Sequence, residues 1–312
     1  MRASRSSSLS GVLLAGIATL AFAGDAVVDG RTLQRAETQL QVDIVGVEDP
    51  QRVAMLQRWV AEAADATRTR SGRFPLARAV VRVSETDSRD PSPVPWGQTR
   101  RGDPVAVLLY VRRDADAAAL RADWTAVHEL SHLYHPYLGD RGRWLAEGLA
   151  SYYQNVLRAR AGMLDADEAW RRLDAGFRRG ERAASGMRLD AMGRTRGGTM
   201  RIYWAGAAYW LDADIALRTR HHATLDEVLD RYARCCLDGG AHVAPEDFVA
   251  TLDRVAGVSV FVPRYERYAA EAMFPEVAAL LGALGLKRDG DALQFAQHGA
   301  GARLRRAITT RD

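Results

Sequence analysis

The sequence predicts an α+β fold in which a small lobe with a mixed sheet precedes a mostly helical lobe. Apolar and polar residues alternate in short segments of the first third of the chain, and apolar residues recur at helical spacing over most of the remainder. Segments rich in proline and glycine separate these elements. The expected lobes span residues 24–138 and 139–312, after an N-terminal segment of residues 1–23.

Residues 1–23 have the composition of a cleavable signal peptide. Two arginines precede an apolar run over residues 11–22, and Ala21 and Ala23 have the small-residue spacing that signal peptidase recognises. The run is too short for an ordinary membrane span, and no later stretch approaches the roughly 20 apolar residues that a spanning helix needs. We therefore expect a secreted or periplasmic protein with no membrane span in the mature chain.

The first lobe should combine strands with one long helix. Residues 40–44 alternate between apolar and polar side chains, as a half-buried strand does. Asp49 followed by Pro50 predicts the N-cap and first position of a helix that runs to about residue 69. Further strands are expected over residues 77–83 and 105–111, with a loop rich in proline and glycine over residues 87–104.

From residue 114 onward the pattern is mainly helical. The first helical stretch should continue to His135, where the following Pro136 disfavours helical backbone. A short hairpin is expected near Gly290, and the sequence contains no internal repeat. The later helices are expected over residues 144–160, 166–183, 199–220, 225–236, 245–256 and 263–273.

Charge and cysteine content restrict the possible functions. The formal net charge is +4, and the basic residues, all arginine except Lys287, are scattered along the chain. The clustered basic runs with interleaved aromatic residues that a nucleic-acid groove needs are missing, so no nucleic-acid partner is expected. Cys235 and Cys236 are adjacent, which excludes a conventional disulfide framework. A buried pair of thiols, a vicinal or intermolecular disulfide and a second metal site all remain open.

The segment TAVHELSHLY contains a metal-binding pattern of the HExxH type. His128 and His132 are four residues apart in an expected helix, so both imidazoles lie on one face and can reach a single zinc ion. Glu129 lies next to them, where its carboxylate can act as general base and accept the proton of a zinc-activated water. The alternative is an exposed helix with two surface histidines.

A catalytic zinc ion normally takes three protein ligands, so a third ligand is needed. The segment RWLAEGLASYYQNVL follows a short loop and predicts an amphipathic helix antiparallel to the first. Glu147 is in its opening turn, away from the apolar face, where it can point at the metal. The alternative is a carboxylate that is favoured near a helix N-terminus by the helix dipole.

HELSH followed by WLAEGLASYY resembles the gluzincin zinc metallopeptidases, in particular the bacterial glycyl aminopeptidase and membrane alanyl aminopeptidase families. The resemblance covers roughly residues 124–268 and implies a thermolysin-like two-lobed fold. It also implies that Glu147 is the third zinc ligand, because it matches the glutamate of the families' Trp-Leu-x-Glu-Gly helix.

A second match concerns the segment IYWAGAAYW. Tyr203 stands three residues before Gly206, as does the tyrosine of the families' Tyr-x-Lys-Gly motif, although Ala205 replaces the lysine. The resemblance implies that the Tyr203 hydroxyl donates to the oxyanion of the substrate. The alternative is an ordinary aromatic residue packed between helices.

Other polar residues near the motifs are weaker candidates. Ser151, one turn after Glu147, could hydrogen-bond a metal ligand. His135 is close enough to suggest a substitute ligand, but Pro136 should turn it away from the ligand face. His221 and His222 are expected at a solvated helix end.

Together these assignments predict a secreted or periplasmic metallopeptidase that carries one Zn²⁺ per chain and hydrolyses a peptide or protein substrate. By analogy with gluzincins, residues 105–111 or 95–99 would bind the substrate main chain as an edge strand. The acidic residue that holds the substrate amine in the aminopeptidase families has no clear counterpart in VPWGQTRRGDPV, where Asp103 is the only carboxylate. The alternative function is a catalytically inactive, gluzincin-like periplasmic binding or assembly module.

Overall fold

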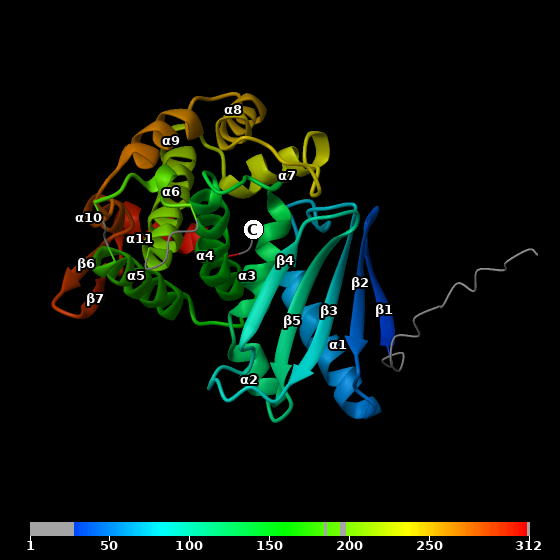
Figure 1. Ribbon diagram of the computed structural model, residues 1–312. Helices are drawn as coiled ribbons and strands as arrows, with labels where there is room; N and C mark the ends of the chain where they lie inside the picture. The colour runs from blue at the N-terminus through cyan, green and yellow to red at the C-terminus, as the bar shows by residue number, and fades with distance from the viewer. Residues whose placement is uncertain (1–27, 184–185, 194–197, 311–312) are drawn as a thin grey trace, which may run out of the picture.

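The computed structural model describes residues 28–183, 186–193 and 198–310. The expected signal peptide, residues 1–23, lies outside the described residues. A strongly twisted sheet with one long helix on its face stands beside a group of helices formed by the rest of the chain (Figure 1). This arrangement confirms the predicted α+β fold with a small mixed sheet and a mostly helical remainder.

The sheet has five strands in the order β1-β2-β3-β5-β4. The central pairs β2–β3 and β3–β5 are parallel, whereas the outer pairs β1–β2 and β5–β4 are antiparallel. The strands span Val28–Arg35 (β1), Thr38–Val45 (β2), Arg78–Thr86 (β3), Trp96–Arg100 (β4) and Val105–Arg112 (β5).

Strand β4 corrects the predicted loop over residues 87–104. Its sequence, WGQTR, has no apolar alternation, because an edge strand buries neither face completely and so needs no apolar stripe. Strand β5 lies between β3 and β4, so it cannot be the edge strand that the sequence also suggested. Of the two segments considered for binding a substrate main chain, only β4 has a free edge.

Helix α1 (Pro50–Ala66) covers one face of the sheet. Asp49 caps it as predicted, accepting a hydrogen bond from the backbone N–H of Gln51 at 2.9 Å. Trp59 fixes its position relative to the next segment, donating from Nε1 to the carbonyl of Leu120 at 2.9 Å.

The helix expected from residue 114 is divided into three pieces: α2 (Ala117–Ala122), α3 (Thr125–Ser131) and the 3₁₀ turn η1 (His132–Tyr134). The break is at Asp123, whose backbone is extended and whose carboxylate accepts the N–H of Thr125 at 2.7 Å. A helical pattern alone does not reveal this break, because the Asp123 side chain accepts from the first residue of α3 while its backbone ends α2. His135 is extended, as Pro136 predicted.

The remaining helices pack around α4 and α6. Strands β6 (Leu286–Asp289) and β7 (Ala292–Phe295) form the expected hairpin. Helices α10 and α11 were not predicted, because one is only six residues long and the other is rich in arginine. Among the described residues, no helix is long and apolar enough to cross a membrane. The helices are α4 (Arg143–Arg160), α5 (Ala166–Arg182), η2 (Leu189–Ala191), α6 (Thr199–Arg220), α7 (Leu225–Cys235), α8 (Pro245–Ala256), α9 (Phe261–Ala270), α10 (Ala278–Ala283) and α11 (Gly299–Thr309).

Two glycines bring the backbones of α4 and α6 into direct contact. A Cβ atom on Gly206 would lie 1.9 Å from the carbonyl oxygen of Trp144, and one on Gly148 would lie 2.3 Å from the backbone of Gly206. Trp210 of α6 stabilises the same contact by donating a hydrogen bond from Nε1 to the carbonyl of Leu145 in α4 at 2.8 Å. The contact places the opening turns of α4 and α6 side by side.

Cys235 and Cys236 form a vicinal disulfide at the C-terminal end of α7. Cys235 is exposed, so the interpretation as a buried thiol pair is wrong. Two adjacent cysteines in a sequence do not indicate whether a tertiary contact buries them.

Candidate metal centre

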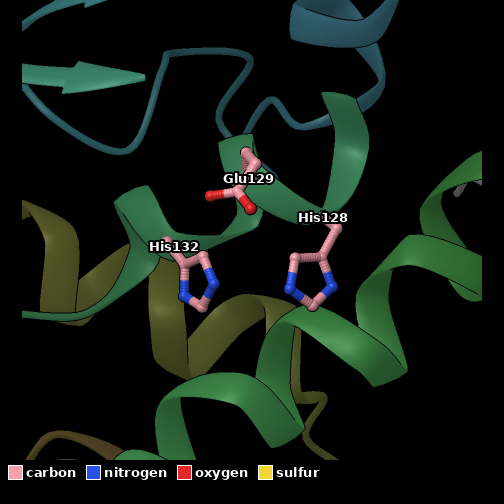
Figure 2. A group of neighbouring side chains, drawn as sticks. All are labelled: His128, Glu129 and His132. Atoms are coloured by element: carbon pink, nitrogen blue, oxygen red, sulfur yellow. The ribbon is translucent and has the colours of Figure 1, made fainter. Parts of the chain in front are cut away.

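His128 on α3 and His132, the first residue of η1, face each other. Their rings are 5.1 Å apart and nearly perpendicular, and both residues are buried between strand β4 and the helices (Figure 2). The possible ligand atoms of His128, Glu129 and His132 all lie within 4.8 Å of one another. The short helix therefore presents two imidazoles and a carboxylate to one small volume.

Glu147 reaches the two imidazoles from the first turn of α4. Its Oε2 atom lies 3.4 Å from Nε2 of His128 and 3.7 Å from Nε2 of His132. This oxygen is buried and has no hydrogen-bond partner among the described residues. A buried carboxylate oxygen without a partner, flanked by two imidazole nitrogens, fits the two-histidine, one-glutamate ligand set of catalytic zinc sites.

Neighbouring acceptors leave the inward nitrogen of each imidazole without a proton. His128 Nδ1 lies 2.8 Å from the amide oxygen of Gln154, which can only accept, so Nδ1 carries a proton and Nε2 is the bare nitrogen of the neutral imidazole. His135 donates from Nδ1 to the carbonyl of Pro136 at 2.7 Å, which leaves its Nε2 to accept from Nδ1 of His132 at 3.0 Å. In the neutral form, both histidines thus present Nε2 as the nitrogen that can bind a metal.

Two of the weaker candidates, His135 and Ser151, do not make the contacts that were considered for them from the sequence. His135 is not near enough to replace a ligand but supports His132 from behind. The hydroxyl of Ser151 has no described hydrogen-bond partner, so the expected contact with a metal ligand is wrong. Gln154 makes that contact with His128 instead. Its place two turns after Glu147, on the same face of α4, could have indicated this contact from the sequence. His221 and His222 are exposed after α6, as expected.

Electrostatics favour the ionisation states that metal ligands need. Burial alone would raise the pKa of Glu147, but the adjacent imidazoles of His128 and His132 lower it to about 2. Burial holds the pKa of His132 well below its ordinary value, so this imidazole is neutral. The pKa of His128 is raised despite burial, because Glu147 and Glu129 favour its protonated form. A bound cation would replace that proton.

Glu129 is held from the sheet edge by Thr99. The Thr99 hydroxyl on β4 donates to its backbone oxygen at 2.9 Å and lies 3.1 Å from Oε2. Gly97 permits this close approach, because a Cβ atom there would lie 2.7 Å from Cγ of Glu129. Burial raises the pKa of Glu129. The carboxylate is therefore held in one orientation with increased affinity for a proton.

Tyr203 lies on the first turns of α6, where its ring faces the ring of His128. Its ring stacks on the His128 ring at 5.7 Å, with 11° between the planes. Burial and the nearby charge of Glu147 raise the pKa of Tyr203, so the hydroxyl keeps its proton and can donate it. Arg143, one turn before Glu147, lies next to this group, with its Nε 3.8 Å from Glu147 Oε1.

A cleft of about 770 Å³ opens onto these residues between β4 and the first turn of α4. Arg101 lines the cleft and donates to the carbonyls of His132 at 3.0 Å and His135 at 2.8 Å. Burial lowers the pKa of Arg101 to about 10. Asp103 is not among the described lining residues, and its side chain is 90% exposed. Asp103 therefore does not supply a carboxylate to the cleft.

Comparison with known proteins identifies the fold. The family model of the M61 glycyl aminopeptidases matches residues 131–195, which include His132 and Glu147. Solved structures similar to this chain are those of an aminopeptidase N family protein from Idiomarina loihiensis and an M1 zinc metallopeptidase from Deinococcus radiodurans. The chain has the same fold as these structures. The predicted resemblance to these families is thereby confirmed.

The similarity to solved structures extends over most of this chain but less of the others. The Idiomarina protein gives a TM-score of 0.58 at 14% identity over 84% of this chain and 50% of its own. The Deinococcus enzyme gives 0.51 at 16% identity, over 80% and 53%. Aminopeptidase A from Legionella pneumophila gives 0.55 at 14% identity, over 80% and 28%. The chain thus spans about half the length of these structures or less. A search of curated proteins finds no match.

Proposed function

We propose that this protein is a secreted or periplasmic zinc-dependent metallopeptidase in which His128, His132 and Glu147 hold one zinc ion. The observation that carries the proposal is the convergence of three atoms that can bind a metal, Nε2 of each histidine and the buried, unpartnered Oε2 of Glu147. Export is supported by the signal-like composition of residues 1–23. The M61 family match supports a peptide substrate.

The reaction requires a base, an oxyanion donor and a Lewis acid. When bound, a zinc ion in such a site polarises the scissile carbonyl and lowers the pKa of water to about 7. Glu129 accepts the proton of the attacking water and delivers it to the leaving amine, and Thr99 keeps its carboxylate in position. Tyr203 donates its hydroxyl to the oxygen that becomes negative on the substrate carbonyl.

The substrate main chain would align along β4. This strand pairs with β5 on one side only, so its other edge presents unpaired backbone groups along the cleft. Gly97 and Thr99 line the cleft from β4, within contact distance of Glu129. An extended peptide that added a strand here would pass directly in front of the base.

The test is peptide cleavage by the zinc-loaded protein and by its Glu129→Gln variant. We expect cleavage of a mixed peptide library by the wild type and a loss of roughly 10²–10⁴-fold in rate in the variant, with zinc content unchanged. Glu266→Gln, on the exposed side of α9, is the control and should cleave like the wild type. Absence of cleavage by the zinc-loaded wild type would favour the alternative of an inactive binding or assembly module.

A further inference from the structure

A second pocket of about 400 Å³ lies beside the metal centre, formed by α4, α5 and the first turns of α6. Tyr203 lines both this pocket and the main cleft. Gln154, which holds the His128 ring, and Trp124, whose ring contacts the His128 ring edge-on at 5.2 Å, also line it. A group bound in this pocket would therefore lie next to a metal ligand and the oxyanion donor.

Three arginines line the second pocket, and two of them have no ion pair among the described residues. Arg172 is paired with Glu168 at 2.9 Å. Arg158 is buried, with 1% of its surface exposed, and donates only from Nη2, to the carbonyl of Ala122. Its Nε and Nη1 have no acceptor in the described part of the chain. Arg179 lies over the Trp204 ring at 5.0 Å, where the ring face attracts the cation without accepting all its hydrogen bonds.

Two further polar groups in the wall lack a described partner. The hydroxyl of Ser151 and the indole Nε1 of Trp204 are buried, and neither has a hydrogen-bond partner among the described residues. Buried donors are rarely left unpaired, because each one loses its hydrogen bond with water on folding. None of the described residues that line the pocket is acidic. The wall thus presents positive charge and an excess of donors over acceptors.

We infer that this pocket binds a carboxylate of the substrate, so that the enzyme prefers peptides with an acidic side chain or a free C-terminus close to the scissile bond. This inference rests on the proposed function and adds a substrate class to it. A carboxylate has two oxygens that accept several hydrogen bonds, and the planar guanidinium of Arg158 or Arg179 can pair with both. The same cations would disfavour a substrate amine.

The rim of the pocket suits a carboxylate that is carried on an alkyl chain. Trp124 and Met200 are exposed apolar residues at this rim. Their side chains can cover the methylene groups of a glutamate while its carboxylate reaches the arginines. The rim gives an isolated inorganic anion no such contact.

The first test measures binding and does not depend on cleavage. Three probes are titrated calorimetrically into the zinc-loaded protein: N-acetylglutamate α-amide, N-acetylglutamine and N-acetylglutamine amide. They carry a side-chain carboxylate, an α-carboxylate and no carboxylate, respectively. We expect one of the anionic probes to bind at least about tenfold more tightly than the neutral one, as charge-assisted hydrogen bonds allow. The better anionic probe identifies which carboxylate the pocket takes.

Variants separate the pocket from the metal, which also attracts carboxylates. Arg179→Gln should reduce the preference for the anionic probe to less than about threefold. Arg158→Gln should have the same effect if it folds, and Arg179→Gln suffices if it does not. Arg182→Gln, at the exposed end of the same helix, is the matched control and should keep the preference. An anion preference that survives in Arg179→Gln, or equal binding of all three probes, would overturn the inference.

Cleavage rates then distinguish this inference from the proposed function. Peptides that differ only by glutamate or glutamine after the scissile bond, each as free acid and amide, are compared by kcat/KM. Cleavage without any preference for the anionic forms leaves the peptidase proposal standing and the pocket assignment wrong. Binding of anionic probes that depends on Arg179, without cleavage of any peptide, leaves the pocket standing and removes the peptidase.

Discussion

The ligand histidines depend on residues that do not touch the metal position. Gln154 and His135 each hold the outer nitrogen of one imidazole, and the carbonyl of Pro136 fixes the ring of His135 in turn. Such outer contacts fix both the tautomer and the orientation of the ligand ring. Only the ligands belong to a recognisable motif, because the outer contacts come from residues at other spacings.

We predict that His135→Phe weakens zinc binding roughly 10–100-fold, the range for losing a contact behind a ligand. The variant keeps an aromatic ring in a buried position but cannot accept the hydrogen bond of His132. Competition with a chromogenic chelator measures the affinity. His221→Phe, at the exposed end of α6, is the control. Unchanged affinity in His135→Phe would mean that His132 is oriented by packing alone.

At the scale of elements, the site is where four elements meet: β4, α3 with its continuation η1, α4 and α6. Strand β4 positions Glu129 through Thr99, α3 and η1 carry the two histidines, and the contact between α4 and α6 sets Glu147 beside Tyr203. Gly148 directly follows Glu147, and Gly206 comes one turn after Tyr203. The closest approach of the two helices is therefore adjacent to the residues that it brings together.

Gly206→Ala should reduce the free energy of unfolding by roughly 1–3 kcal/mol or more, because the added methyl group meets backbone that cannot rotate away. It should also lower peptide turnover, since any separation of the helices moves Tyr203 from Glu147. Urea denaturation and turnover are measured on the same preparation. Gly282→Ala, in α10 with open space around the new Cβ, is the control and should stabilise by about 0.5–1 kcal/mol. Equal effects of the two substitutions would contradict this account of the helix contact.

A second contact between elements, centred on Asp226 of α7, predicts a dependence of stability on pH. Arg160 of α4 pairs with Asp226 at 2.8 Å, Tyr153 donates to it at 3.0 Å, and Arg218 of α6 lies 3.6 Å away. Burial alone would raise the pKa of Asp226, but these arginines lower it below its ordinary value. The folded state therefore binds the proton of Asp226 less readily than the unfolded state does, and stability from this group falls as the solution is acidified.

Asp226→Asn should lower the free energy of unfolding at pH 7 by about 1.5–3 kcal/mol, as for hydrogen bonds to charged groups. The difference from the wild type should shrink below about pH 4, where Asp226 becomes protonated in the unfolded chain and then in the folded one. Urea denaturation between pH 3 and pH 7 checks this. Asp247→Asn, on α8, is the control, and a difference that does not change with pH would show that Asp226 acts through packing.

At the scale of the whole molecule, the sequence predicted the elements that bury a continuous apolar face. Helix α4 and the parallel strands β3 and β5 have such faces, and HExxH places two donors one turn apart wherever it forms a helix. Strand β4 was missed because it is short, polar and stabilised by its neighbour β5. The break at Asp123 was missed because the apolar pattern is the same whether this polar residue continues a helix or separates two helices.

The pocket beside the metal centre was also beyond the sequence, for a different reason. Arg158, Arg179 and Trp204 come from three helices whose relative positions depend on tertiary packing. Scattered arginines in the sequence suggested an even surface charge, and only the fold places two of them, without ion pairs among the described residues, in one pocket. Charge distribution in three dimensions cannot be inferred from composition.

The most direct test of the central claim is the zinc content of the purified mature protein and of its Glu147→Ala variant, measured by elemental mass spectrometry. The account predicts about one zinc ion per wild-type chain and a large loss of zinc in the variant, because a catalytic site normally needs three protein ligands. Absence of zinc from the wild type after metal supplementation, or equal zinc in the variant, would contradict the assignment of His128, His132 and Glu147 as the metal centre.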